Sequence, residues 1–281
     1  MPPDWLQPDW PAPANVRAVF SSRSGGVSNP PWDSFNLGSH VGDAPPHVAD
    51  NRLALRAALG SQPVFLNQVH GVAVADVTPT SLDGMLADAC VSTQSGVACT
   101  IMVADCLPVL FTTPCGTAVA AAHAGWRGLA GRSGQGVLES TVTAIHSALK
   151  RIHAADHEIR AQEAPEIIAW LGPCIGPSAF EVGAEVKAAF TSNQADADQH
   201  FANRGKGAEG KYLADLAGLA RARLRALGVN QVYGNDSSVA WCTVSNPSRY
   251  FSHRRDAGIT SNGLANGFGT TGRMAACVWL V

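Results

Sequence analysis

Four short apolar segments between residues 63 and 126 constrain the fold of this chain more than any other feature. They are PVFLNQVHG, GVACTIMVADC, PVLFTTP and GTAVAAAHAGW, and each is bounded by glycine, proline or polar residues. Apolar runs of this length with such boundaries are typical of buried β-strands. The sequence therefore predicts a sheet built around this region. Further strands are predicted elsewhere in the chain, from Val16 and over 166–172, 231–233, 250–252 and 274–281.

Segments with helical periodicity alternate with these strands. Between residues 136 and 150, for example, Val137, Val142 and Leu149 fall on one face of a helix. The polar segment 192–210 instead predicts a mobile loop. This mixture of elements predicts an α/β (α+β) sandwich, in which helices cover a mixed sheet. The other helices are predicted over 47–59, 181–190 and 212–227.

The length and composition of the chain indicate a single domain. Its 281 residues, 46% of them hydrophobic, can bury one large core, since the buried fraction of the surface rises with chain length. The sequence has no internal repeat and no second apolar core, so we expect one domain over residues 1–281. Residues 1–15 are rich in proline and tryptophan and cannot form a helix, so we expect an arm that lies over this domain.

The charge pattern argues against several classes of partner. The 20 basic and 22 acidic side chains nearly cancel and form no like-charged block, so nucleic acid is not an expected partner. No segment approaches the roughly 20 apolar residues that span a bilayer, and no signal peptide is recognisable. The seven cysteines are odd in number and widely spread, which favours reduced thiols. We therefore expect a cytoplasmic protein without a membrane partner.

Three of the predicted strands end in residues that can bind a metal. These residues are His70 in NQVHG, Cys106 in VADCLP and His123 in AAHAGWRG. Two imidazoles and a thiolate suit Zn²⁺, and three protein ligands leave a fourth position open, which is typical of catalytic zinc. The residues come from separate strands without the short spacings of zinc fingers or zincins. Spacing alone therefore also allows three buried side chains that are held by hydrogen bonds.

Five longer motifs resemble a known family. The motifs NQVHG, DCLPVLF, HAGWRGLAG, GPCIGPSAFEVG and SHRRD are spread over most of the chain. Together they resemble the YfiH-type family, also called laccase-domain or multicopper polyphenol oxidase proteins. The resemblance implies a sandwich fold similar to the catalytic domain of cytotoxic necrotizing factor toxins. It also implies a zinc site whose ligands are His70, Cys106 and His123, with Cu²⁺ as the alternative metal.

The same resemblance implies an activity on purine nucleosides. The family is associated with phosphorolysis of adenosine, inosine, guanosine and methylthioadenosine, and with deamination of adenosine. An open metal site suits deamination because a metal can activate water for attack on C6 of adenine, whereas phosphorolysis needs a seat for orthophosphate near C1′ of the ribose. The expected partners of this catalytic domain are therefore purine nucleosides and orthophosphate. We expect it to act as a monomer or a weak homodimer.

Arginines near the motifs are candidates for holding orthophosphate. Arg127 lies four residues after His123, and its planar guanidinium matches the geometry of an oxyanion. Arg23 in SSRSGGVS is a second candidate, and Arg132 in the glycine-rich GLAGRSGQG is a third. A structural ion pair is the alternative role of Arg127. The segment GLAGRSGQGVLEST departs from the alanine-rich helix start that is more usual in the family. The resemblance therefore does not decide which residues bind orthophosphate.

Each of the other polar residues near the ligands has two interpretations. Asn36, Asn67 and Gln68 are candidates for binding ribose hydroxyls or the edge of the base, or else they satisfy hydrogen bonds in turns. Asp105 could orient a ligand histidine, although neighbours on a strand face opposite sides. Glu181 could be an acid or base for purine chemistry, or a carboxylate at a helix N-terminus.

Three other functions compete with the zinc phosphorylase. In a thiol hydrolase that acts on an amide, Cys106 would be the nucleophile and His123 its base. A polyphenol oxidase is disfavoured, because multicopper sites use many histidines in His-x-His pairs and the nine histidines of this chain include no such pair. A regulatory or partner-binding protein without catalysis is the third alternative.

Overall fold

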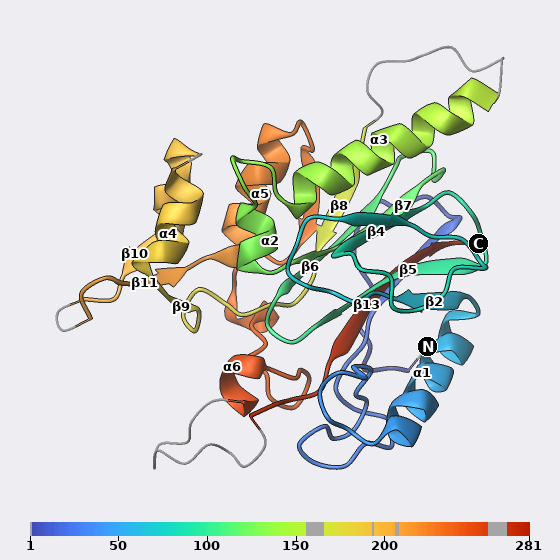
Figure 1. Cartoon of the computed structure of the whole chain (residues 1–281), viewed down its shortest axis with the longest axis horizontal. Coiled ribbons are helices and arrows are strands. Elements are labelled where there is room, and N and C mark those ends of the chain that lie inside the picture. Colours follow the sequence, from blue (N-terminus) through green and yellow to red (C-terminus); the bar gives the residue numbers. More distant parts are fainter. Residues whose placement is uncertain (1, 156–165, 193, 206–207, 258–268) are drawn as a thin grey trace.

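Two β-sheets packed face to face form the centre of the molecule. The computed structural model describes residues 2–155, 166–192, 194–205, 208–257 and 269–281, and Figure 1 shows helices on the outer sides of the sheets. The α/β sandwich that the sequence predicts is thus confirmed. The larger sheet has the order β12 (Gln231–Gly234), β8 (Ile168–Leu171), β6 (Leu107–Thr112), β7 (Val119–Ala124), β4 (Ala89–Ser92) and β3 (Val74–Asp76). The smaller sheet has the order β1 (Val16–Phe20), β13 (Met274–Leu280), β5 (Val97–Val103) and β2 (Gln62–Phe65).

Strand β7 contributes to a hydrophobic core on each side of the larger sheet. Ala121 faces the smaller sheet and lies in one apolar cluster with Ile101 and Val278. Ala120 and Ala122 belong to the cluster on the opposite face. Successive side chains of a strand point to opposite faces, so a strand buried on both sides is apolar throughout. This explains why the sequence shows a continuous apolar run here instead of an alternating pattern.

Helices cover the outer faces of both sheets. Helix α3 (Val137–Ala155) packs Leu138 and Ile145 on the larger sheet, as the periodicity predicts. Helix α1 (Pro45–Leu59) packs Leu55 on the smaller sheet. Within the described ranges, no helix is both long and apolar enough to cross a membrane. The remaining helices are α2 (Trp126–Ala130), α4 (Ala184–Thr191), α5 (Leu216–Ala226) and α6 (His253–Asp256), with 3₁₀ helices at Ala195–His200 and Val239–Trp241.

The segment 192–210, which the sequence predicts to be a mobile loop, is largely structured where it is described. It contains the first 3₁₀ helix and strand β10 (Phe201–Asn203). This strand pairs with β11 (Lys211–Ala214), which in turn pairs with β9 (Glu181–Gly183), and the three form a small third sheet. Phe201 is buried in the core beneath the helices. One aromatic anchor thus orders a segment whose composition is otherwise polar.

Two predicted helix starts and one predicted strand are wrong. Glu181 and Tyr212 lie in short strands, and helices α4 and α5 begin only after them. Helix α5 begins where the carboxylate of Asp215 accepts a hydrogen bond of 2.9 Å from the backbone N–H of Gly218, which is an N-cap. Segment 250–252 forms no strand, because its aromatic side chains are buried by packing without backbone pairing.

The N-terminal segment lies against the smaller sheet. Leu6 exchanges backbone hydrogen bonds of 2.9 and 2.8 Å with Phe20 at the end of β1. Trp5 is buried beside Phe35, with 5.3 Å between the ring centroids. Two pairs of contacts therefore hold this segment on the sandwich.

Candidate metal centre and its cavity

The side chains of His70, Cys106 and His123 converge at one end of the sandwich. Their candidate ligand atoms all lie within 4.8 Å of one another, and no other such group of three or more His, Cys, Asp or Glu residues occurs among the described residues. Sγ of Cys106 lies 3.7 Å from Nε2 of His70. The two imidazole rings meet edge to face, with centroids 4.8 Å apart. The structure thus brings together the three residues that the sequence predicts as metal ligands.

Backbone geometry aims two of these side chains. His70 lies in the loop after β2 with φ 60°, in a region where histidine is more common than most residues. Cys106 follows Asp105, whose φ of 85° turns the chain sharply between β5 and β6. Only His123 lies within a strand, where it pairs with Pro108 across β6 and β7. The site is therefore built from two irregular turns and one strand, whereas the sequence predicted three strand ends.

Asp88 connects two of the three candidate ligands, and the sequence did not predict a role for it. This fully buried residue precedes β4, and its carboxylate accepts a hydrogen bond of 2.8 Å from Nδ1 of His123. The same carboxylate accepts the backbone N–H groups of Val69, His70 and Gly71 at 3.1, 2.8 and 2.6 Å. Burial alone would raise the pKa of Asp88, but the hydrogen bonds from His123 and the backbone hold this pKa below its usual value. With Nδ1 occupied in this way, His123 presents Nε2 to the centre.

The electrostatics of the centre favour a thiolate. Burial opposes ionisation of Cys106, but the charge of His123 and hydrogen bonds from both histidines lower the pKa of Cys106 to about 6. Burial would lower the pKa of His123, but Cys106 and Asp88 raise it to about 9. At neutral pH the protein without metal therefore holds a thiolate beside an imidazolium. The thiolate is the form of cysteine that binds metals.

The arrangement fits a metal ion. A tetrahedral ion with bonds of about 2.0–2.3 Å separates its ligand atoms by roughly 3.3–3.8 Å, and the 3.7 Å between Cys106 and His70 lies in that range. Gly125 keeps the centre open, because a Cβ at this position would lie 2.7 Å from Cδ2 of His70 and 3.0 Å from Sγ of Cys106. The donor set and the space around it therefore both suit a bound ion.

A cavity of about 420 Å³ opens onto the three ligands. Binding sites for small molecules typically have volumes of about 300–1,000 Å³. Trp126, Phe180 and Leu216 contribute apolar walls. The polar side chains that line the cavity beside the ligands are His40, Gln68, Asp105, His253, Arg254 and Arg273.

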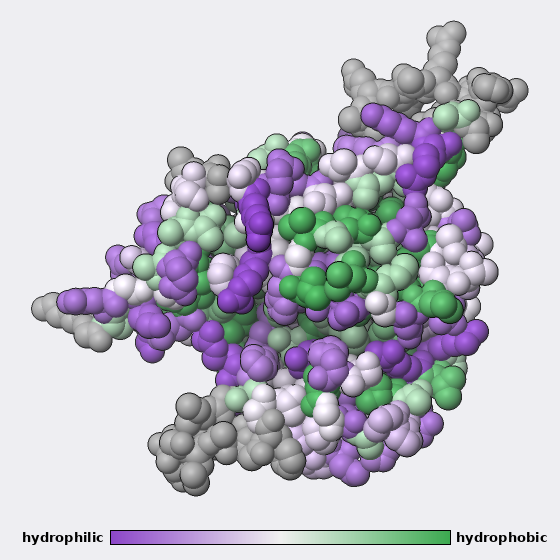
Figure 2. Space-filling model, in the orientation of Figure 1, coloured by the Kyte–Doolittle hydropathy of each residue, from purple (hydrophilic) through white to green (hydrophobic). Residues whose placement is uncertain are grey.

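The loop that carries His70 also exposes apolar side chains. Val69 and Val72 are 54% and 38% exposed, and Leu86, whose backbone bridges to this loop, is 65% exposed. Figure 2 shows apolar residues gathered near the middle of the displayed face, at the place of β4 in Figure 1. Apolar surface therefore adjoins the loop of one ligand on the outside of the protein.

Of the three predicted amide residues, Asn36, Asn67 and Gln68, one lines the cavity, and Asn67 is exposed outside it. Gln68 does so, and its side chain bonds the backbone of Met102 at both ends, with Nε2 donating at 2.8 Å and Oε1 accepting at 2.7 Å. Asn36 is fully buried and does not line the cavity. Its amide group donates to Asp43 at 2.9 Å, and its carbonyl accepts the backbone N–H of Arg273 at 2.9 Å.

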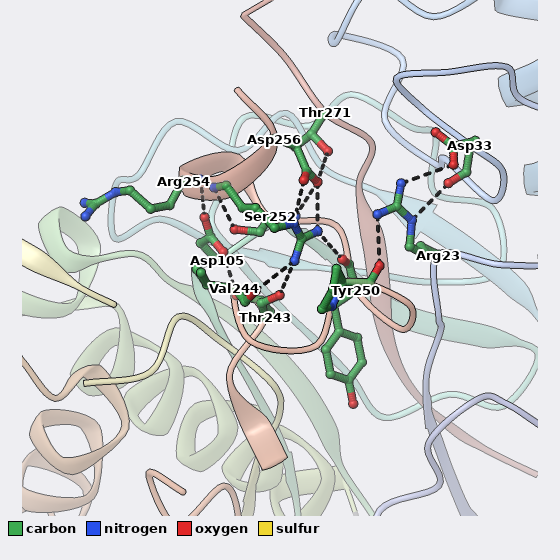
Figure 3. A network of polar contacts seen from close by, with 12 residues as sticks. Arg23, Asp33, Asp105, Thr243, Val244, Tyr250, Ser252, Arg254, Asp256 and Thr271 are labelled. Carbon is green, nitrogen blue, oxygen red and sulfur yellow. Dashed lines mark hydrogen bonds and ion pairs between the residues drawn. The ribbon is translucent and has the colours of Figure 1, made fainter. Parts of the chain in front are cut away.

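The three predicted arginines lie outside the lining of this cavity. Arg127 is exposed and stacks on Trp126, with its guanidinium carbon 4.4 Å from the ring centroid. Arg23 lines a separate shallow groove, where it pairs with Asp33 at 3.3 Å (Figure 3). Arg132 is exposed in a turn that it closes with Gln135. Helix α2 begins at Trp126 and packs Gly128 on the backbone of His70 and Gly71, but Arg127 does not line the cavity.

Asp105 anchors the segment around α6 instead of a ligand histidine. Its carboxylate accepts hydrogen bonds from Oγ1 of Thr243 at 2.5 Å and from the backbone N–H of Arg254 at 2.6 Å (Figure 3). Arg255 extends this network, donating to the carbonyl groups of Thr243 and Tyr250 at 2.7 Å each. The network fixes the part of the chain that brings Arg254 to the cavity.

Glu181 lies away from the cavity. Its carboxylate pairs with Arg204 at 2.7 Å, and both side chains are largely exposed on the small third sheet. The hydrogen bond from Arg204 lowers the pKa of Glu181, so the group is an ordinary surface carboxylate. The structure therefore does not bring Glu181 together with the metal ligands.

The sandwich and its open centre of two histidines and a cysteine define a class of protein, and comparison with known sequences gives the family. Residues 17–281 match the family model described as multi-copper polyphenol oxidoreductase laccase. The chain belongs to this laccase-domain family of YfiH-type proteins, as its motifs predict.

Relatives with similar sequences and structures span the whole chain. The chain is 46% identical to purine nucleoside phosphorylase PA4543 of Pseudomonas aeruginosa, over 98% of each chain. It is also 46% identical to purine nucleoside phosphorylase YfiH of Escherichia coli, again over 98% of each chain. The crystal structure of protein NMB0706 from Neisseria meningitidis superimposes with a TM-score of 0.81 at 42% identity over 99% of both chains. A YfiH protein of Bacillus licheniformis gives a TM-score of 0.71 at 27% identity, over 95% of this chain and 93% of that one.

Proposed function

We propose that this protein is a zinc-dependent purine nucleoside phosphorylase that acts on adenosine, inosine, guanosine and methylthioadenosine, and that it also deaminates adenosine. The names of the relatives from P. aeruginosa and E. coli support the phosphorylase. The observation that carries the proposal is the three-ligand centre of His70, Cys106 and His123 at the cavity. Three ligands leave a coordination position for chemistry, and the cavity is of a size that accepts a small molecule.

The residues of the chain have separate tasks in this proposal. Zinc held by the three ligands would supply a Lewis acid beside the cavity. Asp88 fixes the orientation of His123, so that the ligand set does not have to reorganise when substrate binds. Trp126 and Phe180 offer apolar surface against which a flat purine can be buried.

The test is turnover of adenosine with and without orthophosphate, followed by chromatography and by zinc analysis. Adenine and ribose 1-phosphate should appear only with phosphate, and inosine should report deamination. Cys106→Ala should lose both zinc and turnover. If the wild-type protein holds one zinc ion per chain and releases neither adenine nor inosine, the proposed substrate class is wrong.

A thiol hydrolase acting on an amide is the second candidate, because Cys106, His123 and Asp88 have the order of nucleophile, base and orienting acid. His70 is not a member of such a triad, although its hydrogen bond helps to lower the pKa of Cys106. Hydrolysis of amides by the metal-free protein that survives His70→Ala would favour this candidate, whereas a zinc enzyme would lose its activity in this variant.

A polyphenol oxidase remains disfavoured despite the description of the family model. The described residues contain one group of two histidines and a cysteine, whereas four-electron reduction of dioxygen by copper needs several metal ions. Copper could still replace zinc in this group, since imidazole and thiolate bind both metals. Metal analysis of the purified protein distinguishes the two.

A further inference from the structure

An arginine that forms no ion pair with a described carboxylate lines the cavity. Arg273 directly precedes β13, and one nitrogen of its guanidinium, Nη1, donates to the carbonyl oxygens of Thr271 and Gly272 at 2.9 and 3.2 Å. Nε and Nη2 make no hydrogen bond to any described residue, and no described carboxylate forms an ion pair with this side chain. Burial lowers the pKa of the Arg273 guanidinium, although nearby Cys106 and Asp105 partly offset this effect. Buried charges are usually paired, and guanidinium donors suit the oxygens of carboxylate and phosphate, so the free donors of Arg273 can receive an anion.

The protein holds this arginine in place from the loop before α1. The backbone N–H of Arg273 donates to Oδ1 of Asn36 at 2.9 Å, and its carbonyl accepts the N–H of Leu37 at 3.1 Å. Gly38 packs on its aliphatic stem so closely that a Cβ there would lie 2.7 Å from Cγ. These contacts fix the backbone and the aliphatic stem of Arg273, and so they limit the positions that its guanidinium can take.

The same loop brings His40 to the cavity. His40 lines its rim, and burial together with the charges of Arg273 and Arg52 lowers its pKa. Asp105 is the one carboxylate among the described residues that line the cavity, and it already accepts hydrogen bonds from Thr243 and from the backbone of Arg254. Cationic and neutral donors thus face the cavity beside Arg273, and the negative charges near it are those of Asp105, which is already hydrogen-bonded, and of Cys106, which a bound metal would engage.

We propose that Arg273 and His40 form the seat for orthophosphate, and that Asn36 is a positioning residue for Arg273. This proposal rests on the proposed phosphorylase activity, because orthophosphate is the second substrate of that reaction. In that reaction an oxygen of hydrogen phosphate forms a bond to C1′ as the C1′–N9 bond breaks. The bonding electrons leave with the purine, which takes up the proton that phosphate loses. Arg273 would hold phosphate by charge and by its two free donor groups.

Kinetics of the zinc-loaded enzyme at varied phosphate and adenosine tests the seat. Arg273→Gln should raise the KM for phosphate about tenfold or more, because charge-assisted hydrogen bonds are lost, and should leave the KM for adenosine within about twofold. Arg273→Lys should restore part of the loss. Arg225→Gln, at an exposed position in the last turn of α5, is the matched control and should behave as wild type. An unchanged KM for phosphate in Arg273→Gln, or a raised one in Arg127→Gln alone, would overturn the seat.

Binding of inorganic phosphate, measured by titration calorimetry on the zinc-loaded protein, separates this proposal from the proposed function. If nucleosides are not cleaved but wild-type protein binds phosphate and Arg273→Gln does not, the function fails and the seat stands. If wild-type protein does not bind phosphate, the seat is wrong. Should Arg273→Gln not fold, His40→Ala at the exposed rim should weaken phosphate binding by the same measurement, and unchanged binding in this variant counts against the seat.

Discussion

The carboxylate of Asp88 accepts a hydrogen bond of 2.8 Å from Nδ1 of His123, and both groups are buried. Because the same carboxylate also accepts a hydrogen bond of 2.8 Å from the backbone N–H of His70, one side chain sets the relative position of two candidate metal ligands. Partners of this kind fix the tautomer and the orientation of a ligand imidazole. Asp88 is therefore as much a part of the centre as the atoms that would contact the metal.

Asp88→Asn should weaken zinc binding by about 10- to 100-fold, the usual cost of losing such a partner. The amide has one oxygen to offer to four donors, so we also expect the free energy of unfolding to fall by about 2–4 kcal/mol. Competition with a chromophoric chelator measures the affinity, and denaturant titration measures the stability. Asp50→Asn, an exposed position of α1, is the matched control. Wild-type zinc affinity in Asp88→Asn would contradict the role given to this carboxylate.

The three candidate ligands could be predicted from the sequence, whereas Asp88 could not. His70, Cys106 and His123 stand in motifs that resemble a family. The role of Asp88 instead depends on the pairing of β4 with β7, which sets its carboxylate beside a histidine that is 35 residues away in the sequence. An aspartate at the start of a buried apolar strand was the available signal, because buried carboxylates are rare without partners.

The residues proposed to bind phosphate also could not be predicted from the local sequence. Arg127 was predicted from its closeness to His123 in sequence, yet it is exposed and stacks on Trp126. Arg273 lies 237 residues from Asn36, whose side chain supports it, and nothing in the local sequence links the two. Apolar runs and helical periodicity predict the sandwich, but contacts between distant loops are decided by tertiary packing.

Gly125→Ala should remove most of the bound zinc while leaving the fold intact. The backbone φ of −66° at this position is accessible to alanine, so the change introduces no backbone strain. The added methyl would press on Cδ2 of His70 and Sγ of Cys106, from 2.7 and 3.0 Å. Zinc analysis after dialysis should give well under one ion per chain, and circular dichroism should match the wild type. Full zinc occupancy in this variant would show that the centre has more room than the structure indicates.

Zinc binding should release a proton between about pH 6 and pH 9. In this range Cys106, with a pKa of about 6, is already a thiolate, whereas His123, with a pKa of about 9, carries a proton that zinc must displace. The apparent affinity should therefore rise about tenfold per pH unit, and more steeply below pH 6, where the thiol is protonated too. Chelator competition at several pH values measures the slope. A flat profile between pH 6.5 and 8.5 would contradict the thiolate–imidazolium pair.

Asn36→Ala should act on phosphate through Arg273. Removing the amide leaves the buried N–H of Arg273 and the carboxylate of Asp43 short of a partner, so unfolding should become easier by about 2–3 kcal/mol. A purely structural role would lower activity without favouring one substrate. A positioning role predicts that the KM for phosphate rises by a larger factor than the KM for adenosine. Equal changes in the two KM values would count against it.

The central claim, that the centre of His70, Cys106 and His123 holds a metal required for phosphorolysis, is tested most directly by removing and restoring zinc. Phosphate-dependent release of adenine is measured on the protein as purified, after chelation, and after addition of one equivalent of zinc. The account predicts that activity disappears with the metal and returns with it, and that Cys106→Ala does not respond to zinc. Full phosphorolysis by the metal-free protein would contradict it.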